Sequence, residues 1–324
     1  FSSTSGALNR LRMWALLTFM DTFVYNTLLM IFGGGMIVDI SDFLGQVITA
    51  LQTLFANNVS TLVTTFSVIA GSLMIIFLYI DLTSNATKEL LTLERLVLTF
   101  IKFFVAMVIL IYLPEILDTL FNLAKGIYDM ACDKFTYDNI DYGIRFFPND
   151  GNSNPSQFPD FETIKDALKD AGYSNKVTAV IKHISEFIPL LLVNLVFFVA
   201  KAAAYLITVS NAIMVIVRAV LAPLGIVQLF DDGQRSNGIR YLKKFVGEAL
   251  TFAAIVGILY AASLLQGQLI ASVVSDSLGG ELSVDNIADV LNLSTLVPIV
   301  IIQLSAAGAI MKATQLSNDI VGAH

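Results

Sequence analysis

The chain has 324 residues, of which 56% are hydrophobic and only 14% are charged, and its mean hydropathy is +0.76. This composition excludes an ordinary soluble enzyme and a disordered chain, because both require far more polar or charged residues. One cysteine and two histidines also exclude an intrachain disulfide and a zinc site built from nitrogen and sulfur ligands alone. The composition therefore predicts an all-α, polytopic membrane protein.

The N-terminal part, residues 1–58, is expected to lie on the outer side of the membrane. Its apolar residues through position 32 suit a helix that lies in the membrane interface, with Arg10 and Arg12 at the polar boundary. Residues 22–38 could alternatively span the membrane, with both arginines inside. Asp21 and the glycines that follow favour the interfacial helix.

Five apolar stretches are long enough to cross a bilayer, since a helical span needs about 20 residues. They cover residues 59–80, 96–113, 187–230, 245–274 and 293–311. The first two predict a transmembrane hairpin, residues 59–113. The last three predict a transmembrane helical region, residues 187–324, so the expected architecture has about five spans.

The third apolar stretch is too long for one straight crossing. As a single helix its 44 residues would extend about 66 Å, roughly twice the thickness of the hydrocarbon core. Pro223 removes a backbone donor and Gly225 follows it, so we expect a helix break at these two residues. A division near residues 208–211 would give six spans instead.

The distribution of charge predicts the orientation, because short cytoplasmic loops collect lysine and arginine. The turn at residues 231–244 holds Arg235, Arg240, Lys243 and Lys244, and we place it inside. Residues 276–292 hold four acids and no basic residue, so that loop is placed outside. With five spans, the C-terminus is then inside and residues 114–186 lie outside.

Residues 114–186 form the predicted external polar segment, which is rich in aspartate and turn-forming residues. Residues 160–171 within it predict a short amphipathic helix that docks on a partner or on a neighbouring subunit. Asp150, Asn152 and Asn154 have the spacing that begins a calcium-binding loop. Pro155 and Glu162 then depart from the pattern, so a plain polar turn is the favoured interpretation.

The sequence contains no phosphate-binding loop and no hydrolase or metalloprotease signature. His183 is expected to lie at the membrane interface rather than to act as a ligand or a base. We therefore predict a protein that is not an enzyme, with no cofactor and no metal.

Four ionisable residues interrupt the apolar stretches, and burying each one in lipid is costly. With the predicted orientation, Lys102, Lys201, Arg218 and Glu248 all lie toward the cytoplasmic side. The long basic side chains could reach the interface, which is the favoured interpretation. Lys102, Lys201 and Arg218 could instead form a basic vestibule that is repeated around an oligomer and attracts an anionic substrate.

Small residues recur every four positions in the fourth apolar stretch, at Ala249, Ala253, Gly257 and Ala261. Such a ladder lets helix backbones approach closely, either within one chain or between subunits. Polar amides in the apolar stretches also bury best against protein. They are Asn194, Asn211, Gln228, Gln266, Gln268 and Gln303.

The string RAVLAPLGIVQLFDDGQRSNGIRYLKKF, which begins at Arg218, carries a family resemblance. It resembles the TrbL-type polytopic membrane subunits of conjugative type IV secretion systems, especially those of Gram-positive mobile elements. The matching features are an arginine, an Ala-Pro pair, an apolar stretch ending in Phe, a turn rich in Gly, Ser and Asn, and Tyr-Leu-Lys-Lys. In this chain they are Arg218, Ala222, Pro223, Phe230, Gly233, Ser236, Asn237, Gly238, Tyr241, Leu242, Lys243 and Lys244.

The resemblance implies a channel or scaffold subunit in the bacterial cytoplasmic membrane that serves conjugal DNA transfer or pilus assembly. It also implies a symmetric homo-oligomer, with five subunits expected, that works with other secretion subunits, secretion ATPases, transferred DNA or pilin, and membrane lipids. The basic turn would present Arg235, Arg240, Tyr241, Lys243 and Lys244 to an ATPase or to DNA phosphates. A secondary transporter or small-molecule channel is the alternative, although a transporter should show paired broken helices around a midplane site.

Overall fold

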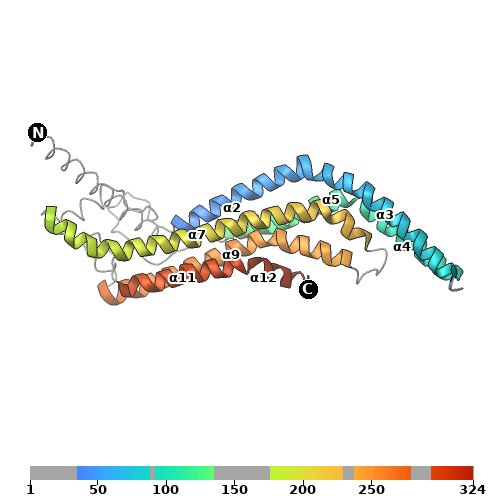
Figure 1. The fold of residues 1–324 in the computed structure, drawn as a ribbon. Helices are drawn as coiled ribbons and strands as arrows, with labels where there is room; N and C mark the ends of the chain where they lie inside the picture. Colours follow the sequence, from blue (N-terminus) through green and yellow to red (C-terminus); the bar gives the residue numbers. More distant parts are fainter. Residues whose placement is uncertain (1–34, 88–91, 135–175, 229–236, 279–292, 324) are drawn as a thin grey trace, which may run out of the picture. The chain divides into compact units, whose positions relative to one another are not determined.

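A computed structural model describes residues 35–87, 92–134, 176–228, 237–278 and 293–323. Every regular element within these ranges is a helix (Figure 1), which confirms the predicted all-α class. Several predicted features lie outside the described residues: the interfacial helix, the turn at 150–162, the helix at 160–171, most of the loop 276–292, and Arg235.

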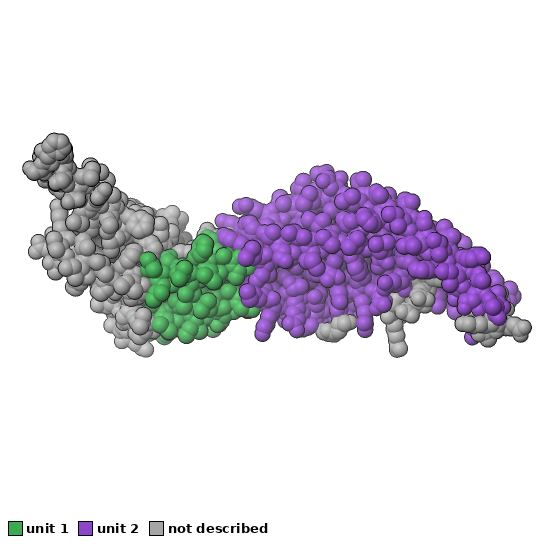
Figure 2. Space-filling model, viewed as in Figure 1, with its two compact units in different colours: residues 1–41, 135–203, 258–308 green, residues 42–134, 204–257, 309–324 purple. Residues whose placement is uncertain are grey.

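The helices follow one another with short or undescribed connections. In chain order they are α2 (Gly35–Leu54), the π-helical turn η1 (Phe55–Val59), α3 (Ser60–Thr87), α4 (Leu93–Ile111), α5 (Leu113–Lys134), α7 (Lys176–Val227), α9 (Asn237–Leu278), α11 (Leu293–Met311) and α12 (Ala313–Ile320). They divide into two compact units (Figure 2). Unit 1 comprises residues 1–41, 135–203 and 258–308, and unit 2 comprises residues 42–134, 204–257 and 309–324.

Three helical segments of the described chain are long and apolar enough to cross a membrane: Asp42–Ser84, Leu191–Val227 and Asn237–Leu269. Two further crossings are available if each of two bent helix pairs is one span. The α4–α5 pair is bent by 62°, and α11, from Leu296, and α12 are bent by 49°. The described part of the chain therefore has three to five candidate spans.

The first long helix has a continuous buried face, formed among others by Leu44, Ile48, Phe55, Val59 and Val63. A straight α-helix repeats every 3.6 residues, so successive four-residue steps would carry this face gradually around the axis. The π-helical turn η1 takes up one additional residue and restores the alignment. The same residues therefore pack on one side of α2 and α3.

The α3–α4 pair is held by close packing and by a polar contact near its connection. Gly71 lies against Leu110, and the Thr99 hydroxyl donates to Asp81 Oδ2 at 3.4 Å. After the bend at Tyr112, α5 packs back on the first helix, where Phe121 stacks on Phe55 with ring centroids 4.6 Å apart.

The first part of the predicted external polar segment 114–186 is thus the helix α5, which is not polar on all sides. Leu117, Phe121, Ala124 and Tyr128 give α5 a buried apolar face, which requires a partner helix. Residues 135–175 of that segment are not described, and residues 176–186 already belong to α7.

The third apolar stretch forms part of a single helix, so the predicted break at Pro223 and Gly225 is wrong. Helix α7 continues through both residues to Val227, and the Gln228 N–H donates to the Gly225 carbonyl in its last turn. The final section of α7 bends rather than stops (Figure 1). A proline inside a helix removes the hydrogen bond to the carbonyl four residues earlier and its ring crowds that carbonyl, which can bend a helix without ending it.

The predicted spans 245–274 and 293–311 correspond to parts of α9 and to α11. Helix α9 begins earlier, at Asn237, so the second half of the predicted basic turn 231–244 is helical. Beyond Lys312, α12 ends at Ile320, and the following Gly322 has a φ of +63°, the left-handed conformation common after a helix. The Ala323 N–H then donates to the Asn318 carbonyl.

Candidate functional site

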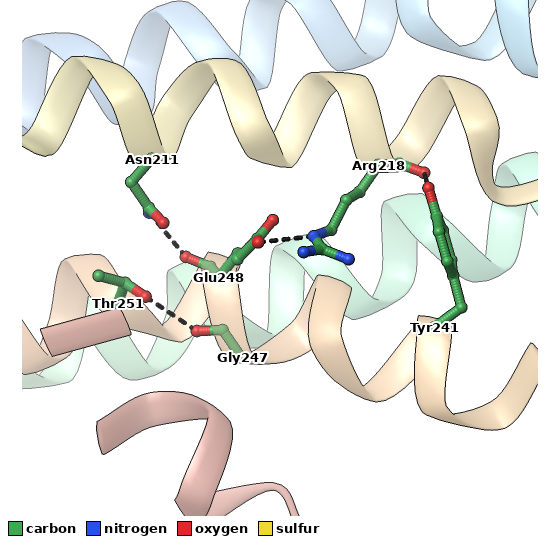
Figure 3. Close-up of polar contacts among 6 residues, drawn as sticks. All are labelled: Asn211, Arg218, Tyr241, Gly247, Glu248 and Thr251. Atoms are coloured by element: carbon green, nitrogen blue, oxygen red, sulfur yellow. Dashed lines mark hydrogen bonds and ion pairs between the residues drawn. The ribbon is translucent and has the colours of Figure 1, made fainter. Parts of the chain in front are cut away.

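The most concentrated polar chemistry in unit 2 lies between α7 and α9 (Figure 3). Arg218 on α7 and Glu248 on α9 form an ion pair, with Nε and Oε1 2.6 Å apart. The Glu248 side chain is only 4% exposed, whereas that of Arg218 is 21% exposed. Two opposite charges in an apolar interior must pair, because an isolated charge there costs several kcal/mol.

Tyr241 joins this pair from the first turns of α9. Its hydroxyl donates to the main-chain carbonyl of Arg218 at 3.0 Å, and the Arg218 guanidinium carbon lies 5.8 Å from the Tyr241 ring centroid. This position allows a cation–π attraction in addition to the hydrogen bond. Tyr241 is therefore turned toward α7 and is not presented outward as the predicted docking residue.

Gly225 makes room for this tyrosine. A Cβ atom built at Gly225 would lie 2.9 Å from Cγ of Tyr241, which is closer than non-bonded carbon atoms approach. The absence of a side chain at residue 225 therefore permits the ring to pack on the helix backbone. This steric role replaces the predicted role of Gly225 in a helix break.

The network extends along the two helices through Asn211. Its Nδ2 donates to the main-chain carbonyl of Glu248 at 2.8 Å, and both residues are buried. Thr251 donates to the Gly247 carbonyl at 3.0 Å within α9. Among the described residues, Oε2 of Glu248 is a buried oxygen without a hydrogen-bonding partner.

The chemistry of this network is that of a fixed contact between two helices. Its carboxylate is neutralised by a guanidinium, and its hydroxyl and amide donors are engaged with backbone carbonyls. The described part of the chain contains no group of three or more His, Cys, Asp or Glu side chains that could hold a metal ion. The arrangement is therefore suited to fixing α7 against α9 within unit 2.

A second contact of this kind involves the C-terminal end. A Cβ atom built at Gly247 would collide with the side chain of Asn318, so α12 approaches the α9 backbone closely. Lys243 Nζ donates to the Gly322 carbonyl at 3.5 Å. The C-terminal helix is thereby placed beside the α9 turn that precedes Glu248.

In unit 1, the buried amides of Gln266 on α9 and Gln303 on α11 hydrogen-bond to each other, with Gln303 Nε2 as the donor. The prediction that polar amides bury against protein is thus confirmed for Asn211, Gln266 and Gln303. Gln228 and Gln268 are exposed.

The residues of the predicted basic vestibule lie in different settings. Lys102 is exposed on α4, Lys201 is partly buried on α7, and Arg218 is paired with Glu248. The guanidinium of Arg218 is therefore engaged within the chain and does not present an unpaired charge.

The predicted docking residues also differ in their exposure. Arg240 and Lys243 are exposed on the first turns of α9, and Lys244 is partly exposed. Tyr241 belongs to the α7–α9 contact described above. Arg240, Lys243 and Lys244 therefore remain as the described basic surface, which we call the α9 basic turn.

The small-residue ladder does not mark one uniformly packed face. Ala249 is buried, Ala253 is partly buried, and Ala261 is exposed. A Cβ built at Gly257 would meet no atom within 4 Å in the described structure. Close helix packing inside the chain does not explain Gly257, and a subunit contact remains a prediction.

Sequence reasoning missed the pairing of Arg218 with Glu248, the inward direction of Tyr241 and the contact of Gly247 with α12. A signal that Tyr241 and Glu248 face the same side of α9 was present in the spacing. Tyr241, Phe245, Glu248 and Phe252 follow one another at intervals of four, three and four, the spacing of one helix face.

Comparisons with protein-family models, with curated proteins and with solved structures found no match to this chain.

Proposed function

We propose that this protein is a non-enzymatic channel or scaffold subunit of a type IV secretion machine that serves conjugal DNA transfer. The observation that carries the proposal is the resemblance of residues 218–244 to TrbL-type subunits. Of the residues that carry it, Arg218 and Tyr241 join α7 to α9, and Pro223 is buried on α7. The resemblance therefore includes residues with a defined packing role.

In this proposal, the buried network supports the α9 basic turn. The ion pair and the tyrosine hydrogen bond hold the first turns of α9 on α7, which fixes the direction in which Arg240 and Lys243 project. A rigid pair of exposed cations suits an acidic surface of a secretion ATPase or a DNA phosphate.

The proposed arrangement has five spans in the bacterial cytoplasmic membrane, with each bent helix pair crossing once. The chain before the candidate span Asp42–Ser84 lies outside and the α9 basic turn lies inside, as the charge distribution favours. The protein acts as a homo-oligomer, for which five subunits are expected, together with other secretion subunits, pilin and membrane lipids.

A DNA-transfer assay tests the proposal. A strain lacking the protein is complemented with the wild-type chain or with the double variant Arg240→Glu, Lys243→Glu, and transfer frequency is measured. The matched control is Lys134→Glu, which changes an exposed charge at the end of α5, on the predicted outer side. We expect loss of transfer without the protein, a strong reduction in the double variant at unchanged membrane levels, and normal transfer in the control. Normal transfer in the deletion strain would remove the secretion proposal.

Transport of a small molecule is the second candidate, and a specific observation favours it. The described chain contains two broken helices, at Tyr112 and at Lys312, whereas the sequence indicated one broken stretch. Broken helices at membrane depth are typical of secondary transporters, where they surround a substrate or ion. Substrate uptake into vesicles containing the purified protein alone would favour this candidate over a secretion subunit.

A further inference from the structure

The exposed surface of the first long helix changes in character along its length. Between residues 46 and 65 no residue is charged, and the exposed side chains are mainly Gln, Asn, Ser and Thr, with two leucines and two alanines. From residue 68 to residue 80 the exposed side chains are large and apolar except for Ser72, such as Val68 at 70%, Ile75 at 57% and Ile80 at 55%. We call the exposed side of residues 46–65 the polar face.

The polar face is continuous across the change from α2 to α3. Gln46, Gln52, Asn57, Ser60 and Thr64 are all exposed, while the buried face lies on the other side of the same helix. The π-helical turn at residues 55–59 keeps the buried residues in line, and it therefore keeps the opposite polar residues in line as well.

The neighbouring helix α7 indicates the surroundings of the polar face. Phe43 contacts Tyr205 with ring centroids 4.5 Å apart, so the start of the polar face lies beside this part of α7. The exposed α7 residues that follow are apolar except for Ser210, and they include Leu206 at 72% and Ile213 at 55%. A surface of this kind is stable in lipid. Unit 2 therefore exposes, beside each other, an apolar surface on α7 and an uncharged polar surface on the first long helix.

The amides of the polar face require water or a polar partner. Four of the five threonine hydroxyls do not, because they donate to their own helix, as Thr49 does to the Gly45 carbonyl at 2.8 Å. Gln46, Gln52, Asn57 and Asn58 form no such side-chain hydrogen bond among the described residues. Each unsatisfied polar group in hydrocarbon costs several kcal/mol, so four amides facing lipid would be strongly unfavourable.

We propose that the polar face of residues 46–65 lines a water-filled path through the membrane, enclosed by several copies of the chain. The copies direct the polar face inward and the apolar face of α7 toward lipid. An uncharged polar lining solvates a moving cargo without holding it, since conduction requires binding weak enough for release. This inference rests on the proposed channel function and assigns its lining.

Cysteine accessibility tests the lining independently of DNA transfer. In a Cys132→Ser background, Gln46→Cys, Gln52→Cys and Asn57→Cys are compared with the matched variants Leu206→Cys and Ile213→Cys on α7. The variants are treated in membranes with a charged, water-soluble methanethiosulfonate reagent. The polar-face cysteines are expected to react at least ~10-fold faster, because thiol modification requires the thiolate and lipid suppresses ionisation. Brominated lipids should quench a fluorophore attached at the α7 positions more strongly than one at the polar face.

Two results would overturn the inference. Equal labelling of the α7 cysteines would place this whole level in bulk water outside the bilayer. Protection of the polar-face cysteines, together with disulfide formation between copies, would identify a dry subunit contact. If the lining is labelled as expected but DNA transfer does not depend on the protein, the path stands and the secretion proposal fails.

Discussion

The buried ion pair of Arg218 and Glu248 offers the sharpest test of the α7–α9 contact. Arg218→Met leaves a Glu248 carboxylate that is only 4% exposed, which should cost about 3–5 kcal/mol of unfolding free energy. Glu248→Leu leaves an arginine that is 21% exposed and can still reach water or lipid headgroups. Its cost should be smaller, about 1–3 kcal/mol. The double variant removes both charges and should regain most of the loss, since apolar pairs of similar volume are often as stable.

The measurement is a double-mutant cycle. Each variant is unfolded reversibly in mixed micelles with increasing SDS, and the folded fraction is read by pulse proteolysis. We expect a coupling energy of at least ~2 kcal/mol, well above the ~0.2–1 kcal/mol of exposed pairs. The charge-swapped variant Arg218→Glu, Glu248→Arg should recover more stability than either charge reversal alone. A coupling energy below ~0.5 kcal/mol would refute the conclusion that the two charges are buried and in contact.

Three further predictions use other contacts. Gly247→Ala should destabilise the chain by more than ~1 kcal/mol, because the added Cβ would collide with α12. The control Gly257→Ala places its Cβ in open space and should cost nothing. Unfolding in SDS compares the stability of the two variants. Gln303→Leu should cost ~0.6–1.7 kcal/mol and leave the amide of Gln266 unpaired, and the same loss in a Gln266→Leu background would contradict their hydrogen bond. An impermeant maleimide should label Cys132 on intact cells; labelling only after lysis would reverse the predicted orientation.

The helices could be predicted from the sequence because a stretch of about 20 apolar residues has few alternatives to a spanning helix. Their ends could not be predicted as well, because a helix continues past the apolar stretch wherever another helix covers its buried face. Phe121 stacked on Phe55 is the clearest case, since it packs α5 on another helix within a segment whose acidic composition indicated an external polar segment. The 62° bend between α4 and α5 depends on tertiary packing, and no short-range sequence pattern indicates it.

The polar network shows where sequence reasoning about charges in a membrane span reaches its limit. Arg218 and Glu248 were each placed correctly in apolar stretches, and each was interpreted by itself. Thirty positions separate them, so no local spacing indicates that they meet. Their pairing depends on the antiparallel return of α9 along α7, which the intervening residues do not specify.

The packing role of Arg218 and Tyr241 also bears on the functional meaning of the family resemblance. Tyr241 contacts both Arg218 and Gly225, so selection for a tight α7–α9 contact is a sufficient reason for this part of the string to occur. Arg240 and Lys243 are exposed; Arg240 has no packing role in the described structure, and Lys243 contributes only a long hydrogen bond to Gly322. They are therefore the residues whose substitution separates function from folding. A transfer defect on reversing their charge, with the α7–α9 contact intact, is the result that a purely structural resemblance does not explain.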